Sequence, residues 1–289
     1  MTTKSFAYNA KTHVFSFDPA TEGFFNLAMQ ITKRCGLNCL PCCESDPTSE
    51  LQTPELVTVV KRLEEHAVRR VCLTGGEPTI RKDFVQIVNE LYNAGIIVTL
   101  ASNCYQIIPS IPEIQGKVAN IRATLFGTKT THDNITKQPG SYRKLQNAVS
   151  QLLEAEIPVY ACMTLMQSNL QELEQVWQTC QEGGIEKLLT FSLMNKGRGK
   201  TIFERERVTD AEVQRQLKTV TGNIYWTNFM REGQCAMIQP DGNLIATPCY
   251  SEPTGVKVVG SVLKEPLLAL WQKYPYKKNY LAYYGEKTE

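Results

Sequence analysis

Three cysteines near the start of the chain have a spacing that suits a metal cluster. Cys35, Cys39 and Cys42 follow the pattern C-x3-C-x2-C in one short segment. Three thiolates on a tight loop can bind three irons of a cubane [4Fe–4S] cluster and leave the fourth iron open to another ligand. The alternative is a zinc knuckle, which needs a fourth ligand nearby. The adjacent Cys43 offers only an awkward geometry and no histidine lies close, so the spacing favours an iron–sulfur cluster.

Composition excludes several other classes of protein. The 289 residues suit one large α/β domain with a small appendage. A formal charge of +2 gives no strong field for nucleic acid or an anionic membrane. The chain has no run of about 18 apolar residues for a membrane span, and residues 1–6 lack the apolar core of a signal peptide. Ten cysteines without an export signal indicate free thiols in a reducing cytosol, so we expect a cytoplasmic protein.

The elements that must position the cysteines alternate between short apolar runs and amphipathic segments, the βαβ pattern of a parallel sheet. Six strands are predicted, at Asn26–Thr32, Arg70–Thr74, Ile97–Ser102, Asn120–Leu125, Val159–Leu165 and Lys187–Leu193. Six βα units are too few to close an eight-stranded barrel. The pattern therefore predicts an α/β fold, an open partial (β/α)6 barrel of the TIM type, with ligands at the carboxyl ends of its strands.

Capping residues predict where the helices between the strands begin. Thr53 is predicted to cap one helix and Ser141 another. Asn169 with Glu172 three residues later resembles a capping box. The segment 111–118 has a weaker helical pattern, and a last helix of this part is predicted over 209–220. Three cysteines in these elements, Cys72, Cys162 and Cys180, are predicted to be core residues.

Two polar motifs follow the ends of predicted strands. Thr74-Gly-Gly-Glu-Pro78 follows the second strand, and Ser102-Asn103 ends the third. Each motif alone is compatible with a simple βα turn. Placed about thirty residues after the C-x3-C-x2-C spacing, the Gly-Gly-Glu-Pro motif becomes specific. In this order, the motifs resemble those of the radical S-adenosylmethionine (SAM) enzymes.

The resemblance implies a binding site for SAM. In that family the Gly-Gly-Glu motif receives the amino group of SAM, the glycines allow a close backbone approach, and the glutamate pairs with the ammonium. The Ser-Asn pair is similar to the family's ribose-binding position, and Thr124 would reach the same ligand. The cofactor-binding residues implied are Gly75, Gly76, Glu77, Pro78, Ser102, Asn103 and Thr124.

A second segment resembles a turn common in the peptide-modifying branch of the family. It is Asn195-Lys-Gly-Arg-Gly-Lys200, and two roles for Arg198 stay open: a contact with the SAM carboxylate, or a cap of the loop. One residue departs from the family pattern. The position before the third cluster cysteine is usually aromatic and packs near the adenine, but here it is Pro41.

The resemblance also implies the reaction and its partners. The cofactors would be a [4Fe–4S] cluster and SAM, which one-electron reduction cleaves to a 5′-deoxyadenosyl radical that abstracts a hydrogen atom from the substrate. The substrate would be a peptide or a small natural product, and an electron donor such as flavodoxin or ferredoxin would supply the electron. Only 34 residues precede Cys35, too few for a fused leader-binding domain, so a separate leader-peptide-binding protein is the expectation for a peptide substrate.

The C-terminal part is predicted to be an extension, residues 224–289, after a barrel of residues 1–223. A hairpin turns at Asp241-Gly242, a strand covers 256–262 and a short helix 264–271. This layout resembles the SPASM and Twitch extensions that hold auxiliary iron–sulfur clusters. Three roles for Cys235 and Cys249 stay open: ligands of an auxiliary cluster, remnants of a lost one, or a catalytic thiol that donates a hydrogen atom to the substrate radical.

Alternative functions also stay open. The thiol donor would make the protein a radical SAM epimerase, and the adjacent Cys42-Cys43 also resembles the cluster loop of peptide epimerases. A cyclase of the molybdenum-cofactor type is another alternative, although its family ends in a glycine pair and this chain ends at residues 285–289 with Gly-Glu-Lys-Thr-Glu. The remaining alternative, from a different class, is a binding protein with structural metal.

Overall fold

A ten-stranded, mostly parallel sheet forms the centre of the molecule. The computed structural model describes residues 6–9, 14–17, 23–44, 49–227, 235–246 and 257–285. The strand order is β12-β11-β10-β3-β4-β5-β6-β7-β8-β9, and all neighbours from β10 through β3 to β9 run parallel. The strands of the parallel part are β3 (Asn26–Thr32), β4 (Arg70–Gly75), β5 (Ile97–Ser102), β6 (Val118–Thr124), β7 (Val159–Leu165), β8 (Leu188–Ser192) and β9 (Ile224–Thr227).

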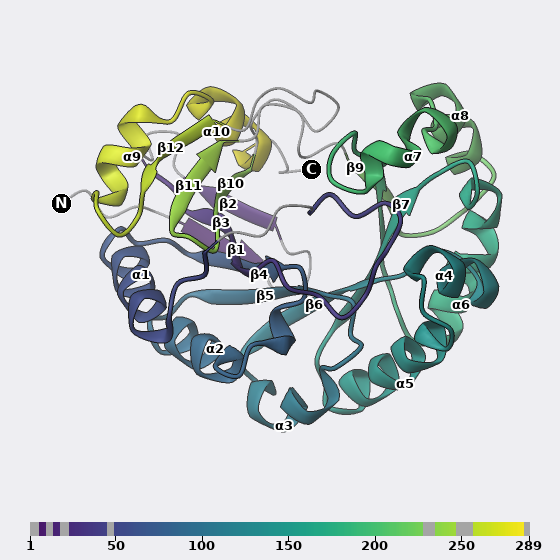
Figure 1. Ribbon diagram of the computed structural model, residues 1–289, viewed down its shortest axis with the longest axis horizontal. Coiled ribbons are helices and arrows are strands. Elements are labelled where there is room, and N and C mark those ends of the chain that lie inside the picture. Colours follow the sequence, from purple (N-terminus) through teal and green to yellow (C-terminus); the bar gives the residue numbers. More distant parts are fainter. Residues whose placement is uncertain are drawn as a thin grey trace.

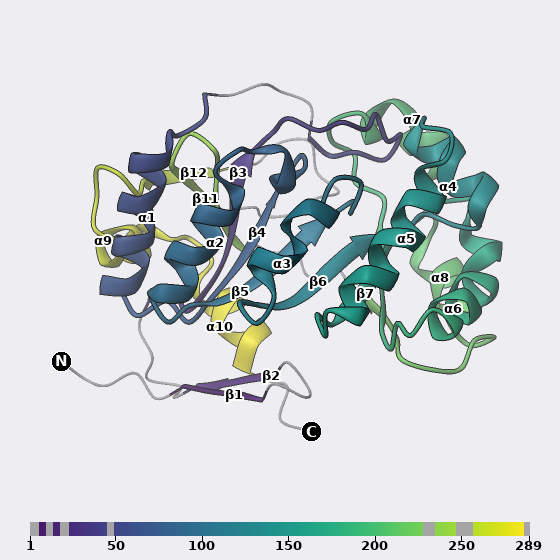
Figure 2. The same ribbon diagram turned by 90° about the horizontal axis from the view of Figure 1, so that it is seen from below.

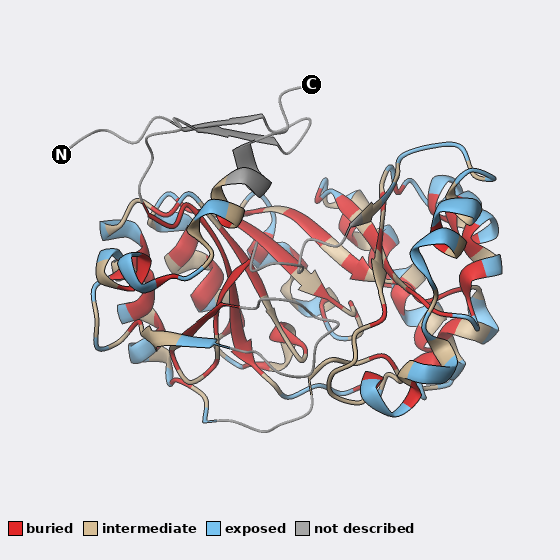
Figure 3. Ribbon diagram, turned by 90° about the horizontal axis from the view of Figure 1, so that it is seen from above, coloured by how far each residue is buried: buried red, intermediate tan, exposed pale blue. Residues whose placement is uncertain are grey.

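The sheet curls, and helices cover its outer face (Figure 1). The covering helices include α1 (Thr53–Glu65), α2 (Phe84–Asn93), α5 (Ser141–Glu154) and α6 (Leu173–Glu182). Each buries one apolar stripe, for example Leu56, Val59, Val60 and Leu63 on α1, against the outward-facing strand residues. Figure 3 shows the result, with buried strands and helices exposed on their outer sides. Among the described strands the order starts at β12 and ends at β9, so the predicted open partial barrel is confirmed.

The six predicted strands are all present, and three of them, β3, β5 and β7, have the predicted bounds. The parallel strand β9 was missed because Ile224–Thr227 is short and half-exposed. Three helices were also missed, α4 (Lys129–Thr136), α7 (Gly199–Glu206) and α10 (Lys277–Gly285). The weak helical pattern over 111–118 forms only the short α3 (Ile111–Ile114), after which β6 begins.

Two predicted N-caps are wrong by one residue. Thr53 is the first residue of α1, whose N-cap is Gln52, and its hydroxyl donates to Asp83 Oδ2 at 2.6 Å. Ser141 is the first residue of α5, whose N-cap is Gly140. The Ser141 hydroxyl donates to Asp133 Oδ1 at 2.9 Å. In both cases a carboxylate from another segment takes the hydroxyl that would otherwise cap the helix.

The predicted capping box at Asn169 is also wrong. Asn169 Nδ2 donates to Phe126 O and Thr164 O, at 2.8 and 2.9 Å. Glu172 instead accepts from the Thr128 backbone N–H at 2.7 Å, and a 3-10 turn, Leu170–Glu172, precedes α6. The helix predicted over 209–220 is α8 (Asp210–Leu217), which begins with a capping box between Thr209 and Glu212.

The C-terminal hairpin extends the barrel sheet. β10 (Ala236–Ile238) and β11 (Asn243–Ala246) pair antiparallel around the predicted turn, and β12 (Lys257–Ser261) is the predicted third strand. β10 runs parallel to β3, with Met237 beside Ala28. The predicted helix over 264–271 is α9 (Leu267–Lys273). The proposed boundary at residue 224 therefore falls within a continuous sheet.

The last described helix, α10 (Lys277–Gly285), packs on the start of β3. Tyr280 is fully buried with edge-to-face contacts to Phe24 and Phe25. Strands β1 (Phe6–Asn9) and β2 (Val14–Phe17) form a separate antiparallel pair, which Figure 2 shows beside α10. Across the described ranges, the helices are too short or too polar to cross a lipid bilayer.

Candidate active site

The segment after β3 carries the three predicted cluster cysteines and is held by three other connections of the barrel. We call residues 33–44 the cysteine loop. The Glu77 N–H donates to Arg34 O at 2.9 Å, and the Leu40 N–H donates to Ile135 O at 2.9 Å. The Gly199 N–H donates to Cys42 O at 3.1 Å. The loop is thus fixed by the segments that follow β4, β6 and β8, at the carboxyl ends of the strands.

The two glycines of the Gly-Gly-Glu motif pack closely against the end of β3 and the start of the cysteine loop. A Cβ atom on Gly76 would lie 2.3 Å from Arg34 O and 2.5 Å from Lys33 O. A Cβ atom on Gly75, whose φ is +156°, would lie 2.2 Å from Thr32 O. The sequence prediction ascribed these glycines to a close approach of SAM. The close approach in the structure is to the backbone that leads into the cysteines.

Glu77 joins two of the predicted motifs. Its Oε1 accepts from Thr79 Oγ1 at 2.7 Å and from Ser102 Oγ at 2.9 Å, and its Oε2 accepts from the Asn103 N–H at 2.7 Å. Glu77 is 1% exposed, and this burial raises the pKa of its carboxyl against the opposing effect of the hydrogen bonds. Pro78, also buried, begins a 3-10 turn. The described contacts of Glu77 are thus with the protein itself, and the ammonium contact stays a prediction.

The Ser102-Asn103 pair lies beside the cysteine loop, as its position at the end of β5 predicts. Asn103 Nδ2 donates to Cys35 Sγ at 3.5 Å. Ser102 Oγ also accepts from the Cys104 N–H at 2.8 Å, which holds Cys104 in a left-handed conformation with φ of 59°. Thr124 ends β6 half-buried, in register with Cys162 of β7. The structure therefore brings these three residues to the edge of the sheet where the cysteine loop lies.

Arg198 holds the cysteine loop, the second of its two predicted roles. Its Nε donates to Cys39 O at 3.0 Å. The neighbouring Gly197 has φ of +57°, and a Cβ atom there would lie 2.6 Å from Cys42 O. The Gly-Arg-Gly segment is therefore closely packed against the backbone of the cysteine loop from Cys39 to Cys43. A contact between Arg198 and a SAM carboxylate stays a prediction.

The donor set of the cysteine loop fits an iron–sulfur cluster. Cys35 is exposed and Cys39 and Cys42 are half-buried. Burial, with the neighbouring Cys35 and Cys42 sulfurs, raises the pKa of Cys39 to about 12, against the opposing charge of Arg198. Iron bound to these sulfurs would supply the positive charge that favours the thiolates. No three Cys, His or acidic side chains of the described segments converge as for one metal ion, but the ligands of a cubane bind three separate irons.

The other cysteines have different surroundings. Cys180 is buried in the core between α6 and the sheet, as predicted. Cys72 is buried but faces the barrel interior, where Arg122 Nη2 contacts its sulfur. Cys235 is buried in the same interior, where it clusters with Ala28 and Met237. Cys249 lies outside the described residues, so its predicted role is not placed.

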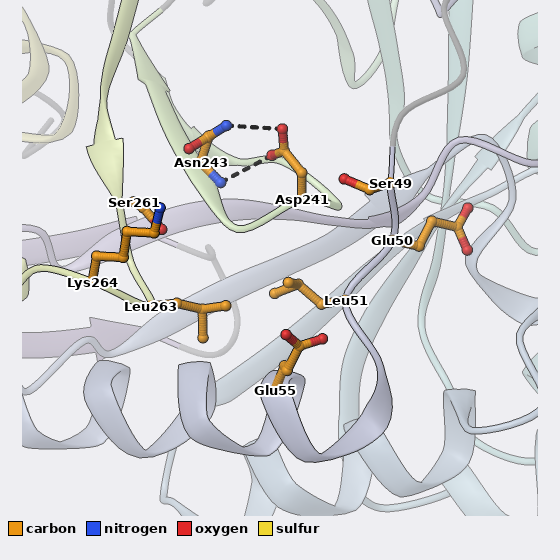
Figure 4. A pocket seen from close by; sticks show the side chains of 9 residues that line it. All are labelled: Ser49, Glu50, Leu51, Glu55, Asp241, Asn243, Ser261, Leu263 and Lys264. Atoms are coloured by element: carbon orange, nitrogen blue, oxygen red, sulfur yellow. Dashed lines mark hydrogen bonds between the residues drawn. The ribbon is translucent and has the colours of Figure 1, made fainter.

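An ion-pair network behind the loop was missed from the sequence. Arg34, the residue immediately before Cys35, forms an ion pair with Glu50 in which Nη2 lies 3.1 Å from the carboxylate. Glu50 also pairs with the buried Arg81 at 3.5 Å. Arg81 also pairs with Asp83 at 2.7 Å. A pocket of about 410 Å3 adjoins this network, between the start of α1 and the β10–β11 turn (Figure 4). Its lining includes Glu50 and Asp241. The Asp241 carboxylate accepts hydrogen bonds from the backbone N–H and the side-chain amide of Asn243.

Comparisons with known proteins agree with this geometry. The AdoMet-dependent heme synthase of Methanosarcina barkeri is 29% identical over 198 residues, 66% of this chain and 56% of the relative. The sporulation killing factor maturation protein SkfB of Bacillus subtilis is 28% identical over 246 residues, 78% of this chain and 60% of SkfB. The chain thus spans somewhat more than half the length of these two curated relatives.

A solved structure shares the fold. SuiB of Streptococcus suis, crystallised with S-adenosylmethionine, has a TM-score of 0.72 at 13% identity, covering 95% of this chain and 69% of SuiB. SuiB crystallised with the precursor peptide SuiA has a TM-score of 0.69 at 11% identity, and the match covers 90% of this chain and 66% of SuiB. The model of the radical SAM superfamily matches residues 29–180, which include the cysteine loop and the Gly-Gly-Glu and Ser-Asn motifs. The chain therefore belongs to the radical SAM superfamily, whose enzymes use a [4Fe–4S] cluster and S-adenosylmethionine.

Proposed function

We propose that this chain is a radical SAM enzyme that modifies a peptide, with a [4Fe–4S] cluster bound by Cys35, Cys39 and Cys42. The observation that carries the proposal is the direct connection of its motifs. Glu77 of the Gly-Gly-Glu turn holds both Ser102 and Asn103, and the Asn103 amide donates to the Cys35 sulfur. Three segments far apart in the sequence thus form one site.

The residues of this site would bind and orient the cofactors. When bound, the cluster and SAM supply one-electron cleavage of SAM and hydrogen-atom abstraction from the substrate. Ser102, Asn103 and Thr124 would contact the ribose of SAM. Arg198 brings a positive charge close to the Cys35 and Cys39 sulfurs and would stabilise their thiolates. The nine described cysteines are free thiols, which suits the reducing compartment that such a cluster requires.

Similarity to SkfB and SuiB supports a peptide substrate. SkfB is named for the maturation of sporulation killing factor, and SuiB was crystallised with a precursor peptide. A flavodoxin or ferredoxin would then supply the electron, and a separate protein would present the leader peptide.

Cys235 favours epimerisation as a second candidate outcome of the same chemistry. Its sulfur lies inside the barrel, and burial raises its pKa to about 12. It therefore remains a protonated thiol at neutral pH, which is the form that can donate a hydrogen atom. Cys249 remains an equal candidate as donor, and an auxiliary cluster bound by these two cysteines is the competing proposal.

The test is cofactor content and SAM cleavage in anaerobically reconstituted protein. The wild type should bind about four irons per chain and form 5′-deoxyadenosine under reducing conditions. Combined Cys35→Ala, Cys39→Ala and Cys42→Ala substitutions should abolish both, whereas Cys180→Ala, in the outer core, should retain both. Cleavage at the wild-type rate in the triple variant would refute the assignment. Deuterium uptake by substrate turned over in D2O, lost in Cys235→Ser or Cys249→Ser, would identify the epimerase and its donor.

A further inference from the structure

The inside of the barrel contains a layer of side chains just below the cofactor edge. Met29, Leu73, Leu100, Ile121 and Val159 form one row of paired residues across β3 to β7, and all five lie in the helix-side core. Since side chains alternate between the two faces of a strand, the next residue of each strand points into the barrel. This interior layer comprises Gln30, Thr74, Ala101, Arg122 and Tyr160.

Arg122 places a positive charge in this layer. A guanidinium stays protonated inside proteins, and burying it is costly unless an anion or several acceptors compensate. The Arg122 Nε atom is enclosed, and within the described residues it has no hydrogen-bond partner. The Nη2 atom contacts Cys72 Sγ, a weak acceptor.

No acidic side chain of the described segments pairs with Arg122. The acidic side chains in the ion pairs of the described residues, Glu44, Glu50, Asp83, Glu204, Glu206 and Glu265, pair with cations other than Arg122. The thiols of Cys72, Cys162 and Cys235 lie close enough to Arg122 to interact with its charge. The charge of Arg122 is therefore not compensated by an acidic side chain of the described residues, and its position suits an anion.

Gln30 adds a hydrogen-bond acceptor to the same layer. Its Nε2 donates to Glu44 Oε1 at 2.7 Å, which fixes the orientation of the amide. Its Oε1 is buried and has no partner among the described residues. Arg122 requires an anion and Gln30 requires an N–H donor. A peptide with a carboxylate supplies both groups.

We propose that Arg122 binds a carboxylate of the peptide substrate inside the barrel, one residue layer below Thr124. The planar carboxylate matches the fork of the guanidinium, and its source is an acidic side chain or the C-terminus of the peptide. This inference rests on the proposed function, because it places the substrate next to the cofactor edge. It names the class of substrate that the enzyme selects, namely an acidic one.

Binding of small probes to the reconstituted full chain tests the proposal. The probes are N-acetylglutamate methylamide, its neutral glutamine counterpart, and N-acetylalanine, which has only a terminal carboxylate. The wild type should bind one of the two carboxylate probes about ten times more tightly than the glutamine probe. The neutral glutamine probe cannot form the charged hydrogen bond with Arg122. The carboxylate probe that binds more tightly identifies the source. Arg122→Gln should lose this preference, and Arg143→Gln, at an exposed position of α5, should keep it.

Three further measurements separate binding from structure. Unliganded Arg122→Gln should unfold at the same or a higher temperature than the wild type, because an uncompensated, half-buried charge is removed. Its iron content and SAM affinity should not change. Arg122→Lys, which keeps the charge but not the fork, should weaken the carboxylate preference without abolishing it.

The proposal would be overturned by equal binding of the glutamate and glutamine probes to the wild type, or by the same preference in Arg122→Gln. A lowered unfolding temperature would make Arg122 structural, and a lost SAM affinity would assign it to SAM; either result also refutes the proposal. Iron content and SAM cleavage of the wild type test the proposed function separately.

Discussion

At the scale of single residues, most of the polar side chains at the site bind other parts of the protein. Glu77 is the clearest example, because its carboxylate accepts from Thr79, Ser102 and Asn103. Such a buried carboxylate fixes the ends of two strands relative to each other, since each donor would otherwise lose a partner. The residue that the motif singles out for ligand binding is thus also a structural link between β4 and β5.

His132 gives a pH dependence that can be measured at this scale. Its Nδ1 accepts from the Phe126 N–H at 3.2 Å, and burial lowers its pKa from 6.5 to about 4. Between about pH 6.5 and pH 4, His132 is therefore protonated in the unfolded chain but neutral in the folded chain. Stability should fall as the pH drops from about 6.5 towards 4, by about 3 kcal/mol over the whole range.

Replacing the imidazole should remove this contribution. His132→Asn offers an oxygen acceptor in place of Nδ1 but does not titrate in this range. Urea unfolding at pH 7 and pH 4.5 should show a smaller loss of stability in His132→Asn than in the wild type. Equal losses in both proteins would show that His132 is protonated normally in the folded state.

At the scale of elements, the site depends on how closely its connections pack. The cysteine loop is bounded by Gly76 on one side and Gly197 on the other, and backbone oxygens of the loop occupy the space that a Cβ atom would need. Glycine is the residue that permits such an approach. These segments follow different strands, so the shape of the loop is set by the sheet that places them.

Gly76→Ala should therefore damage the loop while Gly36→Ala should not. The added methyl at residue 76 would meet backbone oxygens at 2.3 and 2.5 Å, which cannot move without shifting the loop. At residue 36, inside the same loop, no atom lies within 4 Å of the added carbon. Iron bound per chain after reconstitution should fall to well under half of the wild-type value in Gly76→Ala only. Full iron content in Gly76→Ala would show that the loop adapts.

At the scale of the whole molecule, the C-terminal part extends the sheet of the open barrel. β10 pairs with β3 in the sheet, and Leu267, Leu270, Trp271 and Tyr280 belong to the same core as the barrel helices. The Tyr280 hydroxyl accepts from the backbone N–H groups of Phe25 and Asn26, at 3.1 and 2.9 Å. Helix α10 is thus joined to the start of β3, the first barrel strand, and the C-terminal part should unfold together with the barrel.

Tyr280→Phe tests that connection. The variant removes an acceptor from two buried N–H groups, which should cost about 2 kcal/mol. Unfolding should remain a single transition, shifted to lower urea concentration. Tyr92→Phe, at a residue that is 49% exposed, should change stability by less than about 0.5 kcal/mol. Two separate unfolding transitions in Tyr280→Phe, or one transition at the same urea concentration as in the wild type, would indicate that the C-terminal part unfolds independently.

Much of this architecture could be predicted from the sequence because its signals are local. Apolar runs defined the six central strands, and the spacing of Cys35, Cys39 and Cys42 pointed to a cluster whatever the fold. The order of strand-end motifs placed the site at the carboxyl edge of the sheet. The caps at Thr53, Ser141 and Asn169 were wrong because a local motif does not show that a distant acceptor, or a distant donor to Glu172, competes for the side chain.

The sequence by itself determined the superfamily, the motifs of the predicted site and the strands that carry them, because these follow from residue type and short spacing. Only the tertiary structure decided what each side chain contacts. It showed the glycines packed on the cysteine loop, Arg198 on Cys39 O, and Arg122 inside the barrel beside Cys72. Cys72 and Arg122 are fifty residues apart in the chain, and they meet because parallel pairing sets the register of β4, β5 and β6. This register cannot be predicted from the spacing of residues within a single segment.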